Sequence, residues 1–181
     1  QGIVGLLVSA LLSQFPLNSL VCTELYPLRR LAAEKLNVNA VLNPASPDFL
    51  SQARQHLANG ADLSIEVSGS PDAMNTAIGL TAFSGRIIVG SWYGEKRAPM
   101  DLGGSFHRSR IQIISSQVST INPALMGRWT KERRYQAAWQ ALANIQPQKW
   151  ITHRFSIDDA AQAYQLLDAI PQKVIQAVIY Y

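Results

Sequence analysis

The sequence predicts an α/β fold with a doubly wound parallel sheet that lacks its first strand. Short apolar runs alternate with amphipathic runs along residues 1–145, the order typical of repeated βαβ units. The chain has 181 residues, 48% hydrophobic and 15% charged, which is enough to bury a core of ordinary domain size. A strand, helix and strand expected over residues 146–181 follow the sixth strand and are interpreted as part of a second domain.

The chain opens on a glycine turn. Gly2 and Gly5 have the spacing of the last two glycines of a G-x-G-x-x-G motif, whose first glycine would precede Gln1. Glycine at position 2 lets the backbone approach a pyrophosphate, and Gly5 allows a helix to pack closely on a strand. The N–H groups of Ile3 and Val4 at the helix start can then bind the phosphates. Glycines at a helix start also occur in ordinary αβ turns, so the motif alone leaves both interpretations open.

A carboxylate follows the glycine turn at a suitable distance. Apolar residues 6–15 predict a helix, and residues 20–24 (LVCTE) predict a strand that ends in Glu24, 22 positions after Gly2. In dinucleotide-binding folds, the acid that binds the adenosine ribose stands about 20 residues beyond the glycines. This order of helix, strand and acid favours dinucleotide binding. Cys22, the single cysteine, is expected to be a buried core residue and indicates a reducing compartment, the cytoplasm.

The other elements of the sheet follow at regular intervals. Helices are expected at residues 27–36, 47–59 and 71–82, and strands at 40–43, 62–67, 86–90 and 110–114. Parallel sheets of this kind bind ligands at the carboxyl ends of their strands. The small and polar residues that follow the strands are therefore candidate ligand contacts, although turns also favour Ser and Gly.

The pattern changes after Asn122. A loop precedes a long helix at residues 130–145, which is followed by a strand at 150–155, a helix at 157–169 capped by Ser156, and a closing strand at 174–180. The dense basic group from Arg128 to Arg134 lies among helix formers, and we interpret it as a solvated helix face. Since this group is explained by solvation, the formal charge of +4 gives no reason to expect a nucleic-acid partner. The apolar first fifteen residues have no basic leader and are too short to span a bilayer, so no membrane partner is expected.

These blocks, taken together, resemble the medium-chain dehydrogenase/reductase superfamily, the zinc-type alcohol, sorbitol and threonine dehydrogenases. The likeness covers essentially the whole chain, and the segments that carry it are GIVG (2–5), VCTELYPLRRLAAEKL (21–36), VLNP (41–44), GADLSIEVSGSPDAM (60–74), GRIIVGSWYG (85–94) and ITHRFSIDDAAQAYQLL (151–167). The resemblance implies a Rossmann-type NAD(P)-binding domain over residues 1–145, truncated at its N-terminus. Residues 146–181 would then be the C-terminal part of the catalytic domain.

The resemblance also implies cofactor contacts at matching positions. The pyrophosphate would lie on the glycine turn, the adenosine ribose against an acid and a base, and the nicotinamide against later strand ends. The implied residues are Gly2, Ile3, Val4 and Gly5; Glu24 and Arg29; Val67, Ser68 and Gly69; Val89, Gly90 and Ser91; and Ser115, Ser116 and Gln117. Since the Glu24 carboxylate repels a 2′-phosphate, NAD is the expected cofactor, with NADP possible because Arg29 and Arg30 offset part of that repulsion.

Two departures from the family pattern matter. Gln176 stands where relatives often have a Lys or Arg that reaches toward the cofactor phosphates. The zinc ligands of the family belong to an N-terminal domain that these residues do not include, and His56, His107 and His153 have no neighbouring ligands at zinc spacing. We therefore expect no metal site and assign no catalytic residue. His107 is left open between a contact to substrate or subunit and a polar loop residue.

The sequence thus predicts the nucleotide-binding part of an NAD(P)-dependent oxidoreductase of the alcohol dehydrogenase type, inactive by itself. Hydride would pass between nicotinamide and a small alcohol or carbonyl substrate, with zinc only if the N-terminal domain supplies it. The alternatives are a zinc-free reductase of the quinone or enoyl type and a noncatalytic nucleotide-binding scaffold. A homodimer or homotetramer is expected through the strand at 110–114 (RIQII), because uncovered apolar strand edges tend to pair. Because the strand that normally precedes the glycine turn is not among these residues, either a gap at the centre of the sheet or an excised segment is expected as well.

Overall fold

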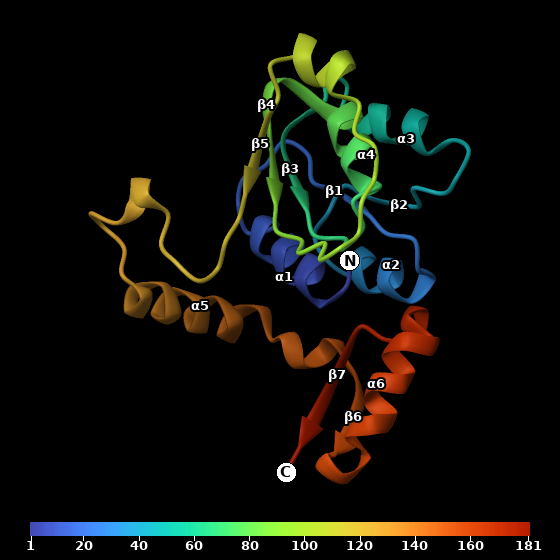
Figure 1. Cartoon of the computed structure of the whole chain (residues 1–181), viewed down its shortest axis with the longest axis vertical. Helices are drawn as coiled ribbons and strands as arrows, with labels where there is room; N and C mark the ends of the chain where they lie inside the picture. Colours follow the sequence, from blue (N-terminus) through green and yellow to red (C-terminus); the bar gives the residue numbers. More distant parts are fainter. The chain divides into compact units, whose positions relative to one another are not determined.

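The computed structural model describes residues 1–181 and has the alternating α/β order that the sequence predicts (Figure 1). The helices are α1 (Ile3–Leu12), α2 (Pro27–Glu34), α3 (Phe49–His56), α4 (Ala73–Leu80), α5 (Lys131–Ile145) and α6 (Ala160–Ala169). The strands are β1 (Val21–Thr23), β2 (Ala40–Leu42), β3 (Ala61–Glu66), β4 (Thr81–Val89), β5 (Gln112–Ser115), β6 (Ile151–Ser156) and β7 (Gln176–Tyr180). Short helical turns are η1 (Leu102–Phe106), η2 (Pro123–Leu125), η3 (Pro147–Trp150), η4 (Ile157–Asp159) and η5 (Pro171–Lys173).

All strand pairs are parallel, as the βαβ pattern requires. The strands form three separate sheets with the orders β1-β2, β3-β4-β5 and β6-β7. The predicted α/β class with parallel sheets is therefore confirmed. No ladder joins β1-β2 to β3-β4-β5.

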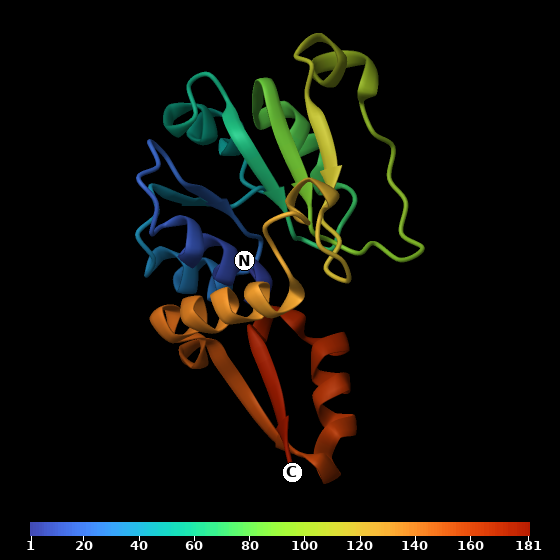
Figure 2. The ribbon, with the colours of Figure 1, turned by 90° about the vertical axis from the view of Figure 1, so that its left-hand side faces the viewer.

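The chain divides into two compact units, and the first comprises residues 1–50 and 140–181. Its core joins the beginning and the end of the chain. Small residues of α1 and α2 let these helices pack closely with aliphatic and aromatic side chains of the later segments; this core consists of Leu6, Ala10, Ala32, Ala33, Ile145, Trp150 and Ile175. Cys22 is buried, as expected of a core residue. In the same unit, α6 lies alongside β6 and β7 (Figure 2).

The second unit comprises residues 51–139. In this unit α4 packs against β3 and β4 (Figure 1). Its Met74 and Ile78 form a core with Ile87 of β4 and Ile111. Ile87 has no exposed surface, which places β4 at the centre of this unit. The domain boundary at residue 145 stays a prediction, since these units describe packing within the present chain.

Three local expectations need correction. β4 begins at Thr81, directly after α4, whereas a helix had been expected up to residue 82; the β3–β4 register shifts before Arg86, and Ser84 adopts a left-handed conformation. The helical turn η1 was not predicted. Ser156 stands at the helix start as expected, but its hydroxyl donates to the Asp159 carboxylate at 2.8 Å and does not cap the backbone.

None of the helices combines the length and the apolar composition that are needed to cross a bilayer.

Candidate nucleotide-binding site

The glycine turn forms the start of α1. Gly2 is the N-cap residue, with extended backbone angles, and its carbonyl accepts the first helical hydrogen bond from Leu6 N at 2.9 Å. No side chain caps this helix end. The N–H groups of Ile3, Val4 and Gly5 are therefore donors of the first helical turn, which have no acceptor within the helix and suit an anion.

Gly2 is not required by the protein's own packing. A Cβ atom built on Gly2 would have Arg29 Nη1 as its nearest neighbour, at 3.7 Å, an ordinary van der Waals distance. On Gly5 the nearest atoms would belong to the Gln1 side chain, at 3.5 Å. The space beside this turn is therefore free of backbone, as a turn that receives a pyrophosphate needs.

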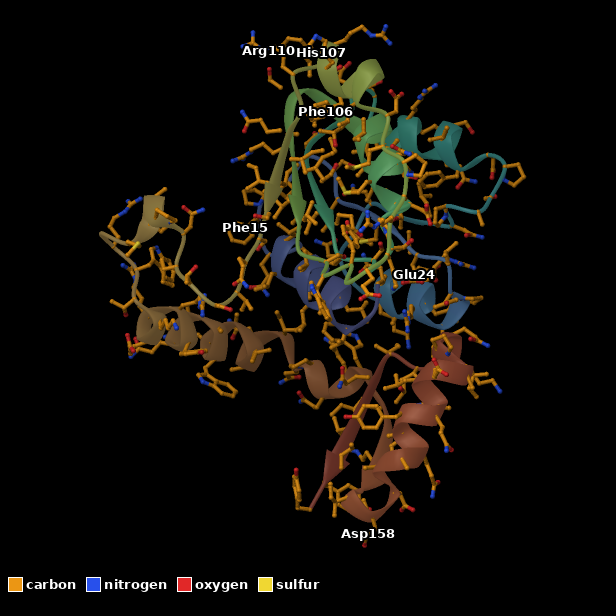
Figure 3. All side chains as sticks on the ribbon, in the orientation of Figure 1. Phe15, Glu24, Phe106, His107, Arg110 and Asp158 are labelled. Atoms are coloured by element: carbon orange, nitrogen blue, oxygen red, sulfur yellow. The ribbon has the colours of Figure 1, made fainter.

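Glu24 directly follows β1 and is directed at the glycine turn. The Glu24 side chain, labelled in Figure 3, is only 8% exposed. Its Oε1 accepts a hydrogen bond from Tyr26 N at 2.8 Å, and its Oε2 pairs with the α-amino group of Gln1. Since Gln1 precedes Gly2, the carboxylate and the helix start lie together within the first unit. The structure thus brings together the two features that the sequence selected by spacing.

Arg29 has a role that the sequence did not predict. Its Nε donates to Val174 O at 3.0 Å and its Nη2 donates to Pro171 O at 2.9 Å, while its guanidinium lies 4.9 Å from the centre of the Tyr26 ring. These bonds tie α2 to the segment between α6 and β7. Only Nη1 lies near Gly2, so Arg29 is first of all a structural link within this unit.

In the second unit, three predicted segments meet at one edge of a sheet. Glu66 pairs with Val89, and Val89 pairs with Ser115, so β3, β4 and β5 end at the same level. Val67, Ser68 and Gly69 follow β3; Gly90 and Ser91 follow Val89; and Ser116 and Gln117 follow β5. Their backbones are linked by bonds from Gly90 N to Glu66 O at 2.9 Å and from Ser116 N to Val89 O at 2.8 Å.

Glycine is needed at two places along this edge. Gly69 has a φ of +74°, a left-handed conformation that side chains rarely adopt. A Cβ on Gly90 would lie 3.0 Å from Val67 Cγ1, which is tighter than ordinary contact. These glycines keep the turn after β3 and the segment after β4 close to each other.

Sequence reasoning missed Glu66 and Tyr93 in this unit. Glu66, the last residue of β3, is 5% exposed; its Oε1 accepts from Ser68 N at 2.6 Å and its Oε2 accepts from the Tyr93 hydroxyl. Burial raises the pKa of Glu66, but hydrogen bonds from Ser68, Tyr93 and Ser91 outweigh it, so the pKa lies below its usual value. Burial and the bond to Glu66 raise the pKa of Tyr93. The signal that could have identified Glu66 was an acid between two apolar residues, Ile65 and Val67, at the end of a predicted strand.

The residues of this chain do not form a zinc site. No group of three or more His, Cys, Asp or Glu side chains is placed to hold a metal ion. His56 ends α3, His153 stacks on Phe155 in β6, and His107 follows η1 at the amino end of β5 (Figure 3). This last position lies at the opposite end of β5 from Ser115.

The family model for zinc-binding dehydrogenases matches residues 4–144. L-threonine 3-dehydrogenase of Vibrio vulnificus is 24% identical over 168 residues, which are 92% of this chain and 46% of that protein. The structure of L-idonate 5-dehydrogenase from Escherichia coli superposes with a TM-score of 0.76 at 19% identity, over 99% of this chain and 48% of that one. The structure of an alcohol dehydrogenase from E. coli CFT073, complexed with NADH, superposes with a TM-score of 0.75 at 16% identity. The superposition covers 99% of this chain and 50% of that one.

The chain thus spans about half the length of the relatives that it matches. The matched residues include α1 from Val4 onward, β1 with Glu24, and the strand ends of the second unit. With a family model that matches most of its length, this chain belongs to the zinc-binding dehydrogenase family.

Proposed function

We propose that this chain forms the NAD(P)-binding part of an alcohol dehydrogenase-like oxidoreductase. The observation that carries the proposal is the meeting of Glu24 with the start of α1, where Gly2 leaves the backbone open. The N–H groups of the first turn suit the pyrophosphate, and the carboxylate suits the two ribose hydroxyls as hydrogen-bond donors. The alcohol dehydrogenase that binds NADH, with the same fold, supports this assignment.

A second set of proposed cofactor contacts lies at the strand ends of the second unit. Val67–Gly69 would border the adenine and its ribose, Val89–Ser91 would approach the nicotinamide, and Ser115–Gln117 would meet its carboxamide. Small side chains and backbone polar groups at these positions suit a flat ring that must be held without collision. A Rossmann domain of residues 1–145 and a catalytic-domain segment of residues 146–181 are part of this proposal.

The chemistry belongs to the cofactor and to groups outside these residues. In an alcohol oxidation, the substrate carbon gives a hydride to the nicotinamide and the hydroxyl oxygen gives up a proton. The present residues would bind and orient the cofactor, and none is assigned to proton transfer. NAD is preferred over NADP in this proposal, since a second negative charge beside Glu24 would be repelled.

The test is titration with NADH and NADPH, followed by nicotinamide fluorescence. We expect NADH to bind with the lower Kd, and Gly2→Ala to weaken binding by about tenfold without a loss of stability, because its Cβ meets no protein atom closer than 3.7 Å. Gly127→Ala is the matched control, since a Cβ there has no neighbour within 4 Å. Absence of binding of both cofactors contradicts the proposal and favours a noncatalytic scaffold.

A dimer through β5 belongs to the same proposal. β5 pairs only with β4, so its other edge offers unpaired backbone groups, and Ile113 and Ile114 are only partly buried. Sedimentation is expected to give a dimer or a multiple of it, and Ile113→Lys is expected to shift it toward monomer. A monomeric wild-type protein excludes this mode of assembly.

A further inference from the structure

Glu66 is a buried carboxylate that the proposed cofactor contacts do not use. Burial of a charge is costly unless the protein replaces its lost water. Unlike Glu24, Glu66 has no ion-pair partner. Its oxygens are satisfied by neutral donors, the Ser68 backbone N–H and the Tyr93 hydroxyl. A buried carboxylate with neutral donors is expected where its hydrogen bonds fix a particular arrangement of the chain.

The donors to Glu66 come from two separate segments. Ser68 belongs to the turn after β3, and Tyr93 belongs to the loop after β4. Two further bonds join the same segments: Gly69 N donates to Ser91 Oγ at 2.9 Å, and Lys96 Nζ donates to Gly69 O at 3.0 Å. The turn and the loop are therefore held against each other, with Glu66 buried between them and Lys96 on the exposed side.

We propose that Glu66 and Tyr93 are positioning residues, which hold the turn after β3 and the loop after β4 in the arrangement that receives the dinucleotide. This inference rests on the proposed function, because these segments are the proposed borders of the adenosine and the nicotinamide. A site whose borders are ordered before binding does not lose their conformational entropy when the ligand arrives. Loss of the hydroxyl or the carboxylate therefore weakens binding without removal of any direct ligand contact.

Tyr93 allows a sharp test, because its ring and its hydroxyl have different partners. The ring packs against the core of the second unit, whereas the hydroxyl binds Glu66. Tyr93→Phe keeps the ring and removes only the bond to the carboxylate. Tyr135→Phe is the matched control, because Tyr135 is 57% exposed on α5.

The experiment measures the Kd of NADH by nicotinamide fluorescence, well below the melting temperature of every variant. Tyr93→Phe is expected to raise the Kd about fivefold and Glu66→Ala about tenfold or more, while Tyr135→Phe leaves it unchanged. Glu66→Gln is expected to stay within about threefold of wild type, because its amide oxygen can accept from Ser68 N and its NH2 group can donate to the Tyr93 oxygen. If Glu66→Gln keeps an affinity for NADH close to that of wild type, the side chain acts by positioning the two segments through hydrogen bonds.

The outcomes separate this inference from the proposed function. Wild-type protein that fails to bind NADH overturns both. Wild-type binding with an unchanged Kd in Tyr93→Phe overturns the positioning role alone, even if Tyr93→Phe melts at a lower temperature. A loss of NADH affinity in Glu66→Gln that equals the loss in Glu66→Ala also overturns the positioning role. If Glu66→Ala does not fold, Tyr93→Phe and Glu66→Gln still decide the question.

Discussion

Glu24 and Glu66 occupy equivalent places in two different parts of the molecule. Each stands at the carboxyl end of a parallel strand, each is buried (8% and 5% exposed), and each accepts a bond at Oε1 from the backbone N–H two residues further on. Only the partner of the second oxygen differs. Oε2 of Glu24 meets the Gln1 amino group beside the glycine turn, whereas Oε2 of Glu66 accepts from the hydroxyl of the partly buried Tyr93.

The difference indicates how one local motif can serve two purposes. The shared bond to the backbone fixes each carboxylate at the strand end in the same way. The second oxygen then decides whether the group faces the site or the interior. The second oxygen of Glu24 is directed toward the helix start, where a ligand would lie. The second oxygen of Glu66 instead accepts a hydrogen bond from the protein's own Tyr93 hydroxyl. We therefore expect substitutions at Glu24 to affect ligand binding most, and substitutions at Glu66 to affect stability most.

The largest expected effect is on stability. Glu66→Ala leaves the Ser68 N–H and the partly buried Tyr93 hydroxyl without their acceptor, so the free energy of unfolding should fall by about 2–3 kcal/mol. Urea denaturation at pH 7 measures this loss. Glu95→Ala, in the exposed loop after Tyr93, is the control and should change stability by less than about 0.5 kcal/mol. A loss below about 1 kcal/mol for Glu66→Ala would remove the distinction between the two carboxylates.

The second effect is on binding. Glu24→Ala removes an ionised acceptor of two ribose hydroxyls, so the Kd of NADH should rise by about 30-fold, equivalent to about 2 kcal/mol. Glu24→Ala also leaves the Tyr26 N–H and the Gln1 amino group without their acceptor, so a loss of stability should accompany the loss of binding. Isothermal titration measures the Kd, with Glu34→Ala on the exposed face of α2 as control. Equal affinity in Glu24→Ala and wild type would contradict the ribose contact.

A third effect separates the charges of the two residues. Glu24→Gln removes the repulsion of a 2′-phosphate, so the ratio of the Kd for NADPH to the Kd for NADH should fall by about tenfold. Glu66→Gln should leave this ratio unchanged, because the proposed site does not bring Glu66 to the ribose. Parallel fluorescence titrations of both variants with both cofactors measure the ratio. An unchanged ratio in Glu24→Gln would be evidence against its place beside the 2′ position.

Much of the fold could be predicted because its signals are local. Apolar runs and helix starts gave every strand and long helix within a few residues, and the parallel pairing follows from their alternation. The start of β4 could not be predicted, because residues 81–85 read as the end of a helix while their structure depends on the bond from Ser84 N to Ser109 O. Such contacts between distant residues leave no mark on local patterns.

The candidate site divides in the same way. Gly2, Gly5 and Glu24 could be selected because their spacing within one βαβ unit is fixed by the fold. Arg29 was named, but its bonds to Val174 and Pro171 depend on packing across most of the chain. Glu66 was missed because no fixed spacing to another motif identifies an acid at the end of a strand. Its partner Tyr93 can be identified only when the structure shows β3 and β4 side by side.

The smallest expected effect is the dependence of stability on pH. Hydrogen bonds hold the pKa of Glu66 below its usual 4.5 in the folded protein, so near this pH the unfolded state binds more protons than the folded state. The stability that Glu66 contributes is therefore complete above pH 4.5 and is lost as the pH falls through the lower, folded-state pKa. Glu66→Gln cannot titrate, so its deficit relative to wild type should shrink as the pH falls below 4.5. Urea denaturation from pH 6 to pH 3 measures both curves, with Glu95→Gln as control, and a constant deficit over this range would contradict the lowered pKa.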